Sequence, residues 1–130
     1  MRLEPGLRWA TMAEREAVID YVYWYSDVPA PPALRELSVN AEQVFGYPMD
    51  AWNEDPYFWQ RLLHPEDAEK AIAATWRSTL DGVPYDITYR MVTRDSRLIW
   101  IHDTAEVERD DTEMGELWRG TWTVIEEPSD

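Results

Sequence analysis

The chain has 130 residues, of which 45% are hydrophobic, and a net charge of −14. The length fits a single domain with its own core, and the acidic charge argues against unaided binding to nucleic acid or to an anionic membrane. The absence of cysteine excludes disulfides, thiolate metal sites and cysteine nucleophiles, and no apolar run approaches the roughly 20 residues of a membrane span.

Residues 1–20 are expected to form an N-terminal extension that carries one short helix. Thr11 and Glu14 have the spacing of a capping box, and small or apolar residues follow at helical spacing. We therefore expect an amphipathic helix from about Met12 to Ile19, outside the main fold. It would act either as a lid on the domain or as a dimer contact. The candidate dimer-contact residues are Ala13, Ala17, Val18 and Tyr21.

Two strands and a short helix are predicted next. The aromatic and β-branched run Tyr21–Tyr25 favours a strand. The prolines between Pro29 and Pro32 end it, because proline cannot donate a hydrogen bond to a neighbouring strand. A second strand is expected between Leu34 and Val39. Asn40 is a good N-cap residue for a short helix over Ala41–Phe45.

The stretch from Phe45 to Asp67 predicts several short helices in succession, opening into a longer one. Gly46 can adopt a positive φ and so end the first helix. Pro48 has the φ of a first helical turn. Aromatic side chains should pack these helices together, namely Trp52, Tyr57, Phe58 and Trp59.

The longer helix is predicted from Pro65 to Leu80. His64 is placed to cap its start, and Glu66 and Asp67 fall in the first turn, where the helix dipole favours carboxylates. Gly82 is the expected stop. Apolar residues recur every four positions and form one stripe facing a sheet. The stripe consists of Ala68, Ile72, Trp76, which should be buried, and Leu80.

After Pro84 the hydrophobic period changes to two, which predicts strands. The first covers Tyr85–Thr93, and a tight turn follows at Arg94–Arg97. The second begins at Leu98 and reaches as far as Glu108. A last strand is expected over Glu116–Ile125. Its inward face should carry Trp118, Trp122 and Val124.

The C-terminal part of the chain concentrates the negative charge. Residues 103–130 hold ten acidic residues and two arginines, so −8 of the net −14 lies there. One interpretation is a solvated sheet edge or tail. The other is a docking surface for a basic partner.

Several short motifs in order resemble the PAS sensor domain. They are Phe45-Gly46-Tyr47, His64-Pro65-Glu66-Asp67, Tyr89-Arg90, Arg94-Asp95 and Trp100. The resemblance covers roughly Val22 to Ile125. It implies an α+β fold with a five-stranded antiparallel sheet, short helices and one long helix on one face, and a pocket between them. We place the domain at residues 21–126, followed by a tail at 127–130.

Two departures from the family pattern stand out. The usual Asp-Gly turn before the Trp strand reads Asp95-Ser96 here, which suggests a different hairpin turn or one residue fewer. The family often ends in an Asp-Ile-Thr-like signature that couples the sheet to an effector. The matching positions here are Val124-Ile125-Glu126.

The two histidines do not indicate catalysis. His64 is explained as the cap of the long helix. His102 lies next to Asp103, but neighbours on a strand point to opposite faces, so a dyad is not expected. No catalytic residue or metal site is predicted. A small α+β enzyme that uses His102 is the least favoured of three hypotheses.

PAS-like domains can hold haem, flavin or a cinnamoyl chromophore, so the resemblance makes each of these a candidate cofactor. Flavin photochemistry and cinnamoyl attachment both use a cysteine, which the chain lacks. Haem would need an axial ligand such as His102. Haem and a non-photochemical flavin are therefore minor alternatives to an unidentified small organic ligand.

A ligand pocket of this type would be mostly apolar with a few polar anchors. The alternative is that the same side chains fill the core themselves. The candidate lining residues are Tyr25, Phe45, Trp59, Leu63, Trp76, Tyr89, Met91 and Trp100.

We therefore expect a sensory or regulatory domain of a bacterial signal-transduction protein. It would sense a small ligand, mediate protein–protein interaction, or do both. The alternative is an interaction module with a filled aromatic core and no ligand. We also expect a homodimer, an effector protein in cis or in trans, and a cytoplasmic location, since no secretory signal follows Met1.

Overall fold

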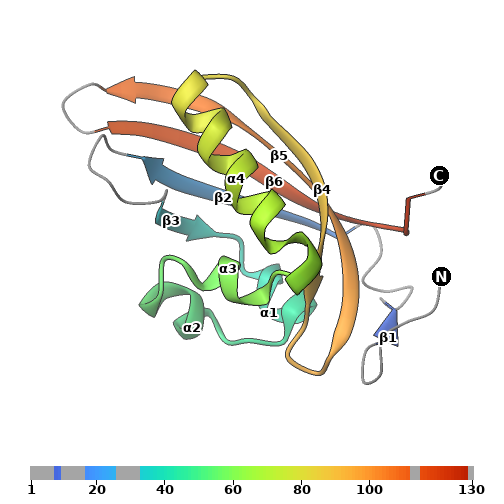
Figure 1. Ribbon diagram of the computed structural model, residues 1–130. Coiled ribbons are helices and arrows are strands. Elements are labelled where there is room, and N and C mark those ends of the chain that lie inside the picture. The colour runs from blue at the N-terminus through green and yellow to red at the C-terminus, as the bar shows by residue number, and fades with distance from the viewer. Residues whose placement is uncertain (1–7, 10–16, 26–32, 112–114, 129–130) are drawn as a thin grey trace.

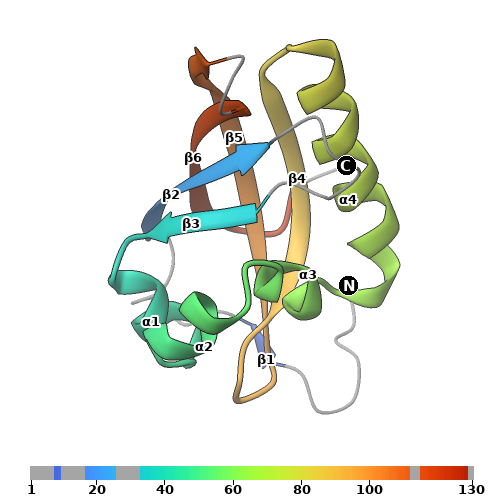
Figure 2. The same ribbon diagram turned by 90° about the vertical axis from the view of Figure 1, so that its left-hand side faces the viewer.

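The computed structural model describes residues 8–9, 17–25, 33–111 and 115–128. Five antiparallel strands form a sheet in the spatial order β3-β2-β6-β5-β4, with the helices on one face (Figures 1 and 2). This confirms the expected α+β fold. The strands are β2 (Val18–Tyr25), β3 (Ala33–Leu37), β4 (Tyr85–Val92), β5 (Arg97–Asp111) and β6 (Gly115–Ile125).

A two-residue strand, β1 (Arg8–Trp9), adds a short parallel pairing that the sequence did not indicate. It pairs with Arg97 and Leu98 at the start of β5. The pairing of β6 with β5 begins only at Trp100. At Leu98, β4 pairs with one edge of β5, and β6 does not reach this position on the other edge. β1 pairs with β5 on that second edge.

Four helices connect β3 to β4. Figures 1 and 2 show α4 running along the sheet beside β4, while the short helices gather near the β4–β5 turn. A backbone hydrogen bond of 2.8 Å from Arg94 N to Phe45 O ties α1 to that turn. The helices are α1 (Asn40–Phe45), α2 (Met49–Glu54), α3 (Phe58–Leu62) and α4 (Pro65–Asp81).

The predicted N-terminal helix is wrong at its C-terminal end. Val18 and Ile19 belong to β2 and pair with Thr123 and Trp122 of β6. Both residues are β-branched, and Ile19 is fully buried, so sheet pairing and burial outweigh the local helical pattern. The earlier part of that helix, from Met12 to residue 16, lies outside the described residues.

The side chain of Asn40 does not cap α1. The N-cap position is Val39, which forms no side-chain cap hydrogen bond. Instead, Asn40 Nδ2 donates to the carbonyl oxygen of Val18 at 2.6 Å, and Asn40 Oδ1 accepts from Ser38 Oγ at 2.6 Å. The amide therefore fastens the start of α1 to β2.

Helix α4 begins and ends where the sequence predicts, and most of its predicted apolar stripe packs against the core. His64 is the N-cap, and Gly82 ends the helix with φ of 68°. Ala68, Ile72 and Trp76 are half-buried and pack against the core, so Trp76 is less buried than expected, whereas Leu80 is 65% exposed and does not belong to the packed face. The buried residues of the helix are small or polar. They are Asp67, Ala71, Ser78 and Thr79.

The β4–β5 turn keeps the geometry that usually takes glycine. Ser96 has φ of 64°, in the left-handed region. Thr93 supports this conformation: its hydroxyl donates to Asp95 Oδ1 at 2.6 Å and accepts from Arg97 N at 2.8 Å. Side-chain hydrogen bonds around the turn thus hold a serine where glycine would be free of strain.

Candidate functional site

A carboxyl group lies buried in the centre of the helix-covered face. Asp103 on β5 is 2% exposed. Tyr21 OH donates to its Oδ1, and Tyr89 OH donates to its Oδ2 at 2.8 Å. The alternation of β5 places Asp103 inward with buried Ile99, Ile101 and Ala105. These donors come from β2 and β4, so the carboxyl group joins three strands of the sheet.

A glycine makes the Tyr21 hydrogen bond geometrically feasible. Tyr21 on β2 pairs with Gly120 on β6, and Gly120 pairs with Ala105 on β5. The tyrosine must therefore cross β6 to reach Asp103. A Cβ atom on Gly120 would lie 2.3 Å from Tyr21 Cζ, so the ring occupies the space that any other residue would fill.

The network extends from the sheet to the short helices. Trp59 Nε1 on α3 donates to Tyr89 OH at 2.8 Å. The two rings meet edge to face, with centroids 6.0 Å apart. A continuous hydrogen-bonded chain therefore runs from α3 through β4 and β5 to β2, by way of Trp59, Tyr89, Asp103 and Tyr21.

Burial raises the pKa of Asp103 to about 7, although the hydrogen bonds from Tyr21 and Tyr89 favour the ionised form. The indole N–H of Trp122 also lowers this pKa but falls short of a full hydrogen bond and has no other partner. Burial raises the pKa of Tyr21 and Tyr89 well above the usual value for tyrosine. Asp103 is thus the group at this centre that changes charge near neutral pH.

A cavity of about 40 Å³ adjoins this carboxyl group. Half-buried residues form its outer part, and buried aromatic side chains form its inner part. Ligand pockets for drug-sized molecules have volumes of about 300–1,000 Å³, so this cavity does not fit haem or flavin. The lining residues are Tyr21, Tyr23, Leu34, Pro56, Tyr57, Trp59, Gln60, Thr75, Tyr85, Asp103 and Trp122.

Aromatic packing fills much of the remaining interior. Phe45 meets Trp122 edge to face at a centroid distance of 5.9 Å and Trp52 at 5.5 Å. Trp52 in turn meets Phe58 at 5.0 Å. Trp118 is fully buried and stacks on Tyr23. Of the predicted inward residues of β6, Trp118, Trp122 and Val124 all lie in this core.

The eight residues expected to line a pocket are not gathered around this cavity. Trp59 lines it, and Tyr89 is joined to it through Asp103. The others that face the helices pack elsewhere in the core: Tyr25 lies against Trp76, Leu63 pairs with Met91, and Phe45 lies against Trp52 and Trp122.

The expectation for Trp100 needs correction. Its neighbours Ile99 and Ile101 point toward the helices, so Trp100 lies on the opposite face of β5. There the guanidinium of Arg90 covers its ring at 5.3 Å from the centroid.

The sequence interpretation missed Asp103 and Tyr21. Asp103 falls at the start of the acidic stretch interpreted as a solvated edge or a docking surface, and Tyr21 falls among the predicted dimer-contact residues. Tyr21 is 5% exposed and faces the core, whereas Val18 is 47% exposed, so these two do not share a face. Ala17 is half-buried and its carbonyl oxygen accepts from Val124 N at 2.9 Å. Ala13 lies outside the described residues.

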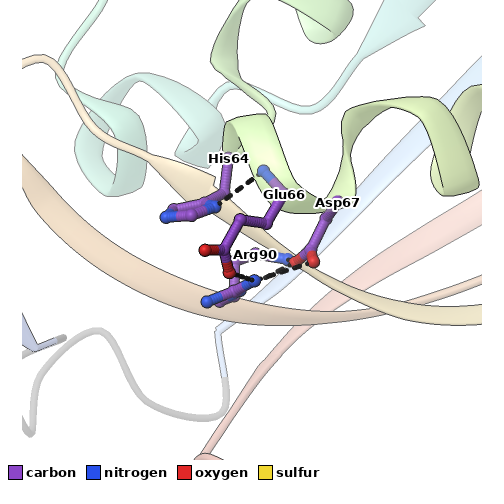
Figure 3. Close-up of polar contacts among 4 residues, drawn as sticks. All are labelled: His64, Glu66, Asp67 and Arg90. Atoms are coloured by element: carbon purple, nitrogen blue, oxygen red, sulfur yellow. Dashed lines mark hydrogen bonds and ion pairs between the residues drawn. The ribbon is translucent and has the colours of Figure 1, made fainter. Parts of the chain in front are cut away.

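The histidine motif has the structural role expected of it. His64 Nδ1 accepts from Glu66 N at 3.1 Å at the start of α4 (Figure 3). Arg90 donates to both oxygens of Asp67, from Nε at 2.8 Å and Nη2 at 2.9 Å, and its Nη2 also donates to Glu66 Oε2 at 3.0 Å. Burial raises the pKa of Asp67, but the hydrogen bonds from Arg90 outweigh it and the pKa is lowered. These contacts bind α4 to β4.

His102 lies on the other face of the sheet from Asp103. Its Nε2 lies 2.8 Å from Asp86 Oδ1, at an exposed position. No dyad with Asp103 forms, as predicted. Among the described residues, no cluster of histidine or acidic side chains is arranged to hold a metal ion.

The family of the chain follows from comparison with known proteins. A family model described as the PAS fold matches residues 35–122. None of the curated proteins matches the sequence.

None of the described helices is both long enough and apolar enough to cross a membrane.

Solved structures of signalling proteins have similar folds. The N-terminal domain of a diguanylate cyclase with PAS/PAC sensor from Marinobacter aquaeolei is 25% identical, with a TM-score of 0.69 over 82% of this chain and 93% of that one. A sensory box histidine kinase/response regulator from Burkholderia thailandensis is 18% identical (TM-score 0.62, 83% and 76%). The LOV domain of a blue-light activated histidine kinase from Erythrobacter litoralis is 16% identical (TM-score 0.62, 87% and 100%). The chain belongs to the PAS fold family.

Proposed function

We propose that this chain is the sensory or regulatory domain of a bacterial, cytoplasmic signal-transduction protein and that it senses a small molecule at the cavity beside Asp103. The family and the sensor domains among similar structures support the signalling role. One observation carries the sensing role: an ionisable carboxyl group is buried in the wall of a cavity. The domain itself would regulate a partner and would not catalyse a reaction.

The physical argument concerns the energetic penalty for burying Asp103. Burying a carboxylate without an opposite charge is unfavourable, and an apolar residue of similar size would give a more stable core. Buried groups with strongly shifted pKa values concentrate at functional sites. The hydrogen bonds of Asp103 also reach β2, β4 and α3. A ligand at the carboxyl group would therefore act on several elements together.

The test is native mass spectrometry on freshly purified protein, beside its absorption spectrum. Excess mass above the 15.3 kDa chain, per protomer, is the expected result. The variant Asp103→Asn should lose that excess mass, whereas Asp86→Asn on the outer face should retain it. Excess mass that persists in Asp103→Asn would place the ligand elsewhere.

A second candidate function is an interaction module with a filled core. The small volume of the cavity, about 40 Å³, and the dense aromatic packing favour it. This candidate predicts bare mass, no stabilisation by small molecules, and function through surfaces alone. An effector protein in cis or in trans would be the partner under either candidate.

We further propose that the domain forms a homodimer through its N-terminal segment. Because Val18 and Ile19 belong to β2, a truncation should remove only residues 1–16. Analytical ultracentrifugation should give a dimer for the full chain and a monomer for the truncated chain. Equal oligomeric states for the two chains would show that this segment does not form the dimer.

A further inference from the structure

We propose that the cavity beside Asp103 binds a small organic cation, namely a primary alkylammonium group held by the carboxylate and surrounded by aromatic rings. This inference rests on the proposed function, because it names the class of ligand that the same cavity would take.

The carboxylate has acceptor capacity left for a ligand. Each carboxylate oxygen has two lone-pair positions. Tyr21 occupies one on Oδ1 and Tyr89 occupies one on Oδ2, so each oxygen retains one. None of the described residues that line the cavity is basic. A ligand ammonium group would therefore supply both the missing positive charge and additional N–H donors.

The walls favour a cation over an anion or a neutral molecule. Aromatic ring faces carry partial negative charge and attract ammonium groups within about 6 Å. An anion would meet the Asp103 carboxylate and the net charge of −14. A neutral ligand would bury the carboxylate further without an opposite charge. The aromatic lining residues are Tyr21, Tyr23, Tyr57, Trp59, Tyr85 and Trp122.

The size and outer lining of the cavity favour a ligand with a small head group and a narrow chain. A volume of about 40 Å³ beside the carboxyl group suits an –NH₃⁺ head and excludes a bulky headgroup. Leu34 and Pro56 line the half-buried outer part, where a short alkyl chain would contact them. This arrangement favours a primary ammonium on a short alkyl chain.

Binding should depend on pH through Asp103. Burial raises its pKa to about 7, so the carboxylate that a cation needs is lost as the pH falls below that value. The charge of His102, on the opposite face of β5, lowers this pKa, and the titratable groups that face Asp103 directly are tyrosines of β2 and β4. Burial raises the pKa of each of them, so they stay neutral across this range; they are Tyr21, Tyr23, Tyr85 and Tyr89. The affinity for a cation should fall about tenfold from pH 8 to pH 6.

Isothermal titration calorimetry with n-butylammonium chloride, beside 1-butanol, tests the inference. We expect butylammonium to bind at pH 8 and the alcohol to bind about tenfold or more weakly, since it lacks the charge. The NMR signal of the Trp59 indole N–H should shift during the titration. Asp103→Asn should weaken butylammonium binding about tenfold or more, while Asp86→Asn should leave it unchanged.

A second variant tests the inference independently in case Asp103→Asn does not fold. Thr75→Leu fills the cavity from α4 and leaves Asp103 in place, and it should also abolish binding. Equal affinity for butylammonium and butanol, undiminished binding by both variants, or no binding by the wild type would overturn the cation assignment. If native mass spectrometry still shows an Asp103-dependent bound species in that case, the sensing role stands and only the class of ligand is wrong.

Discussion

Asp67 and Asp103 are both buried, but their surroundings stabilise different protonation states. Asp67 on α4 accepts two hydrogen bonds from the Arg90 side chain and a third from its backbone N–H at 2.8 Å. Among the described residues, Asp103 on β5 accepts hydrogen bonds from two neutral tyrosine hydroxyls and from no charged donor. The pKa of Asp67 is lowered as a result, whereas that of Asp103 rises to about 7.

The difference separates a structural carboxylate from a candidate functional one. Asp67 has its opposite charge within the protein, and the pair holds the long helix against β4. Asp103 lacks such a partner among the lining residues, and it adjoins a cavity. Burial alone does not identify a functional acid; the missing charge and the adjacent space do.

The largest expected effect is on the pH dependence of stability. Asp103 is protonated below about pH 4 in both folded and unfolded chains. Between pH 4 and 7 only the unfolded chain ionises at this position, so the free energy of unfolding falls as the pH rises. Relative to Asp103→Asn, the wild type should lose about 4 kcal/mol across this range. Urea denaturation at several pH values measures it.

The pH dependence of stability should have the opposite sign for Asp67. The pKa of Asp67 is lowered, so its stabilisation is present above about pH 4 and is lost as the pH falls toward the folded-state value. Parallel stability curves for wild type and Asp103→Asn would contradict the distinction between the two sites.

The next largest effect comes from converting Asp67 into an unpaired carboxylate. Arg90→Met removes its charged partner and should lower the free energy of unfolding by about 3 kcal/mol. The matched control is Arg61→Met, because Arg61 is 69% exposed and pairs with Asp55 at the surface. That variant should change stability by less than about 1 kcal/mol. If chemical denaturation gives similar losses in the free energy of unfolding for both variants, the buried Arg90–Asp67 pair stabilises the fold no more than a surface ion pair.

Gly120→Ala should separate Tyr21 from Asp103. The added Cβ would lie 2.3 Å from the tyrosine ring, so the ring or the strand must move. We expect a loss of about 2 kcal/mol and a weaker hydrogen bond to the carboxyl group. Gly82→Ala, with no atom within 4 Å but φ of 68°, is the control and should cost about 1 kcal/mol. Thermal denaturation compares the two, and an equal cost would mean that close packing over Gly120 matters little.

The smallest effect is expected from Tyr89→Phe. It removes one donor from Asp103 and the acceptor of Trp59 Nε1. A loss of about 1 kcal/mol is expected in urea denaturation, together with a higher pKa for Asp103 followed by NMR. An unchanged carboxyl pKa would indicate that Tyr89 contributes nothing to its electrostatics.

The elements that the sequence predicted well have local signals. The bounds of α4 follow from His64 and Gly82, and the alternation of β4 follows from its own residues. The two faces of β5 were harder to distinguish, because the run from Leu98 to Ile101 is apolar throughout and shows no alternation. Periodicity alone therefore misplaced Trp100.

The missed features depend on partners far along the chain. Val18 pairs with Thr123, and this pairing replaces the helix that the local sequence suggests. Asp103 lies two residues after Ile101 and four after Ile99, so strand alternation could have predicted that it faces the core. Its tyrosine partner on β2, however, lies 82 residues away, and the sequence gives no sign of that contact.

The crossing of Tyr21 over Gly120 also predicts how this domain can change over evolutionary time. A tyrosine at position 21 and a side chain at position 120 exclude each other, because they claim the same space. Among related sequences, glycine at 120 should therefore accompany a large residue at 21, and a larger residue at 120 should appear only where 21 has become small. The two positions should therefore covary although β2 and β6 lie at opposite ends of the chain.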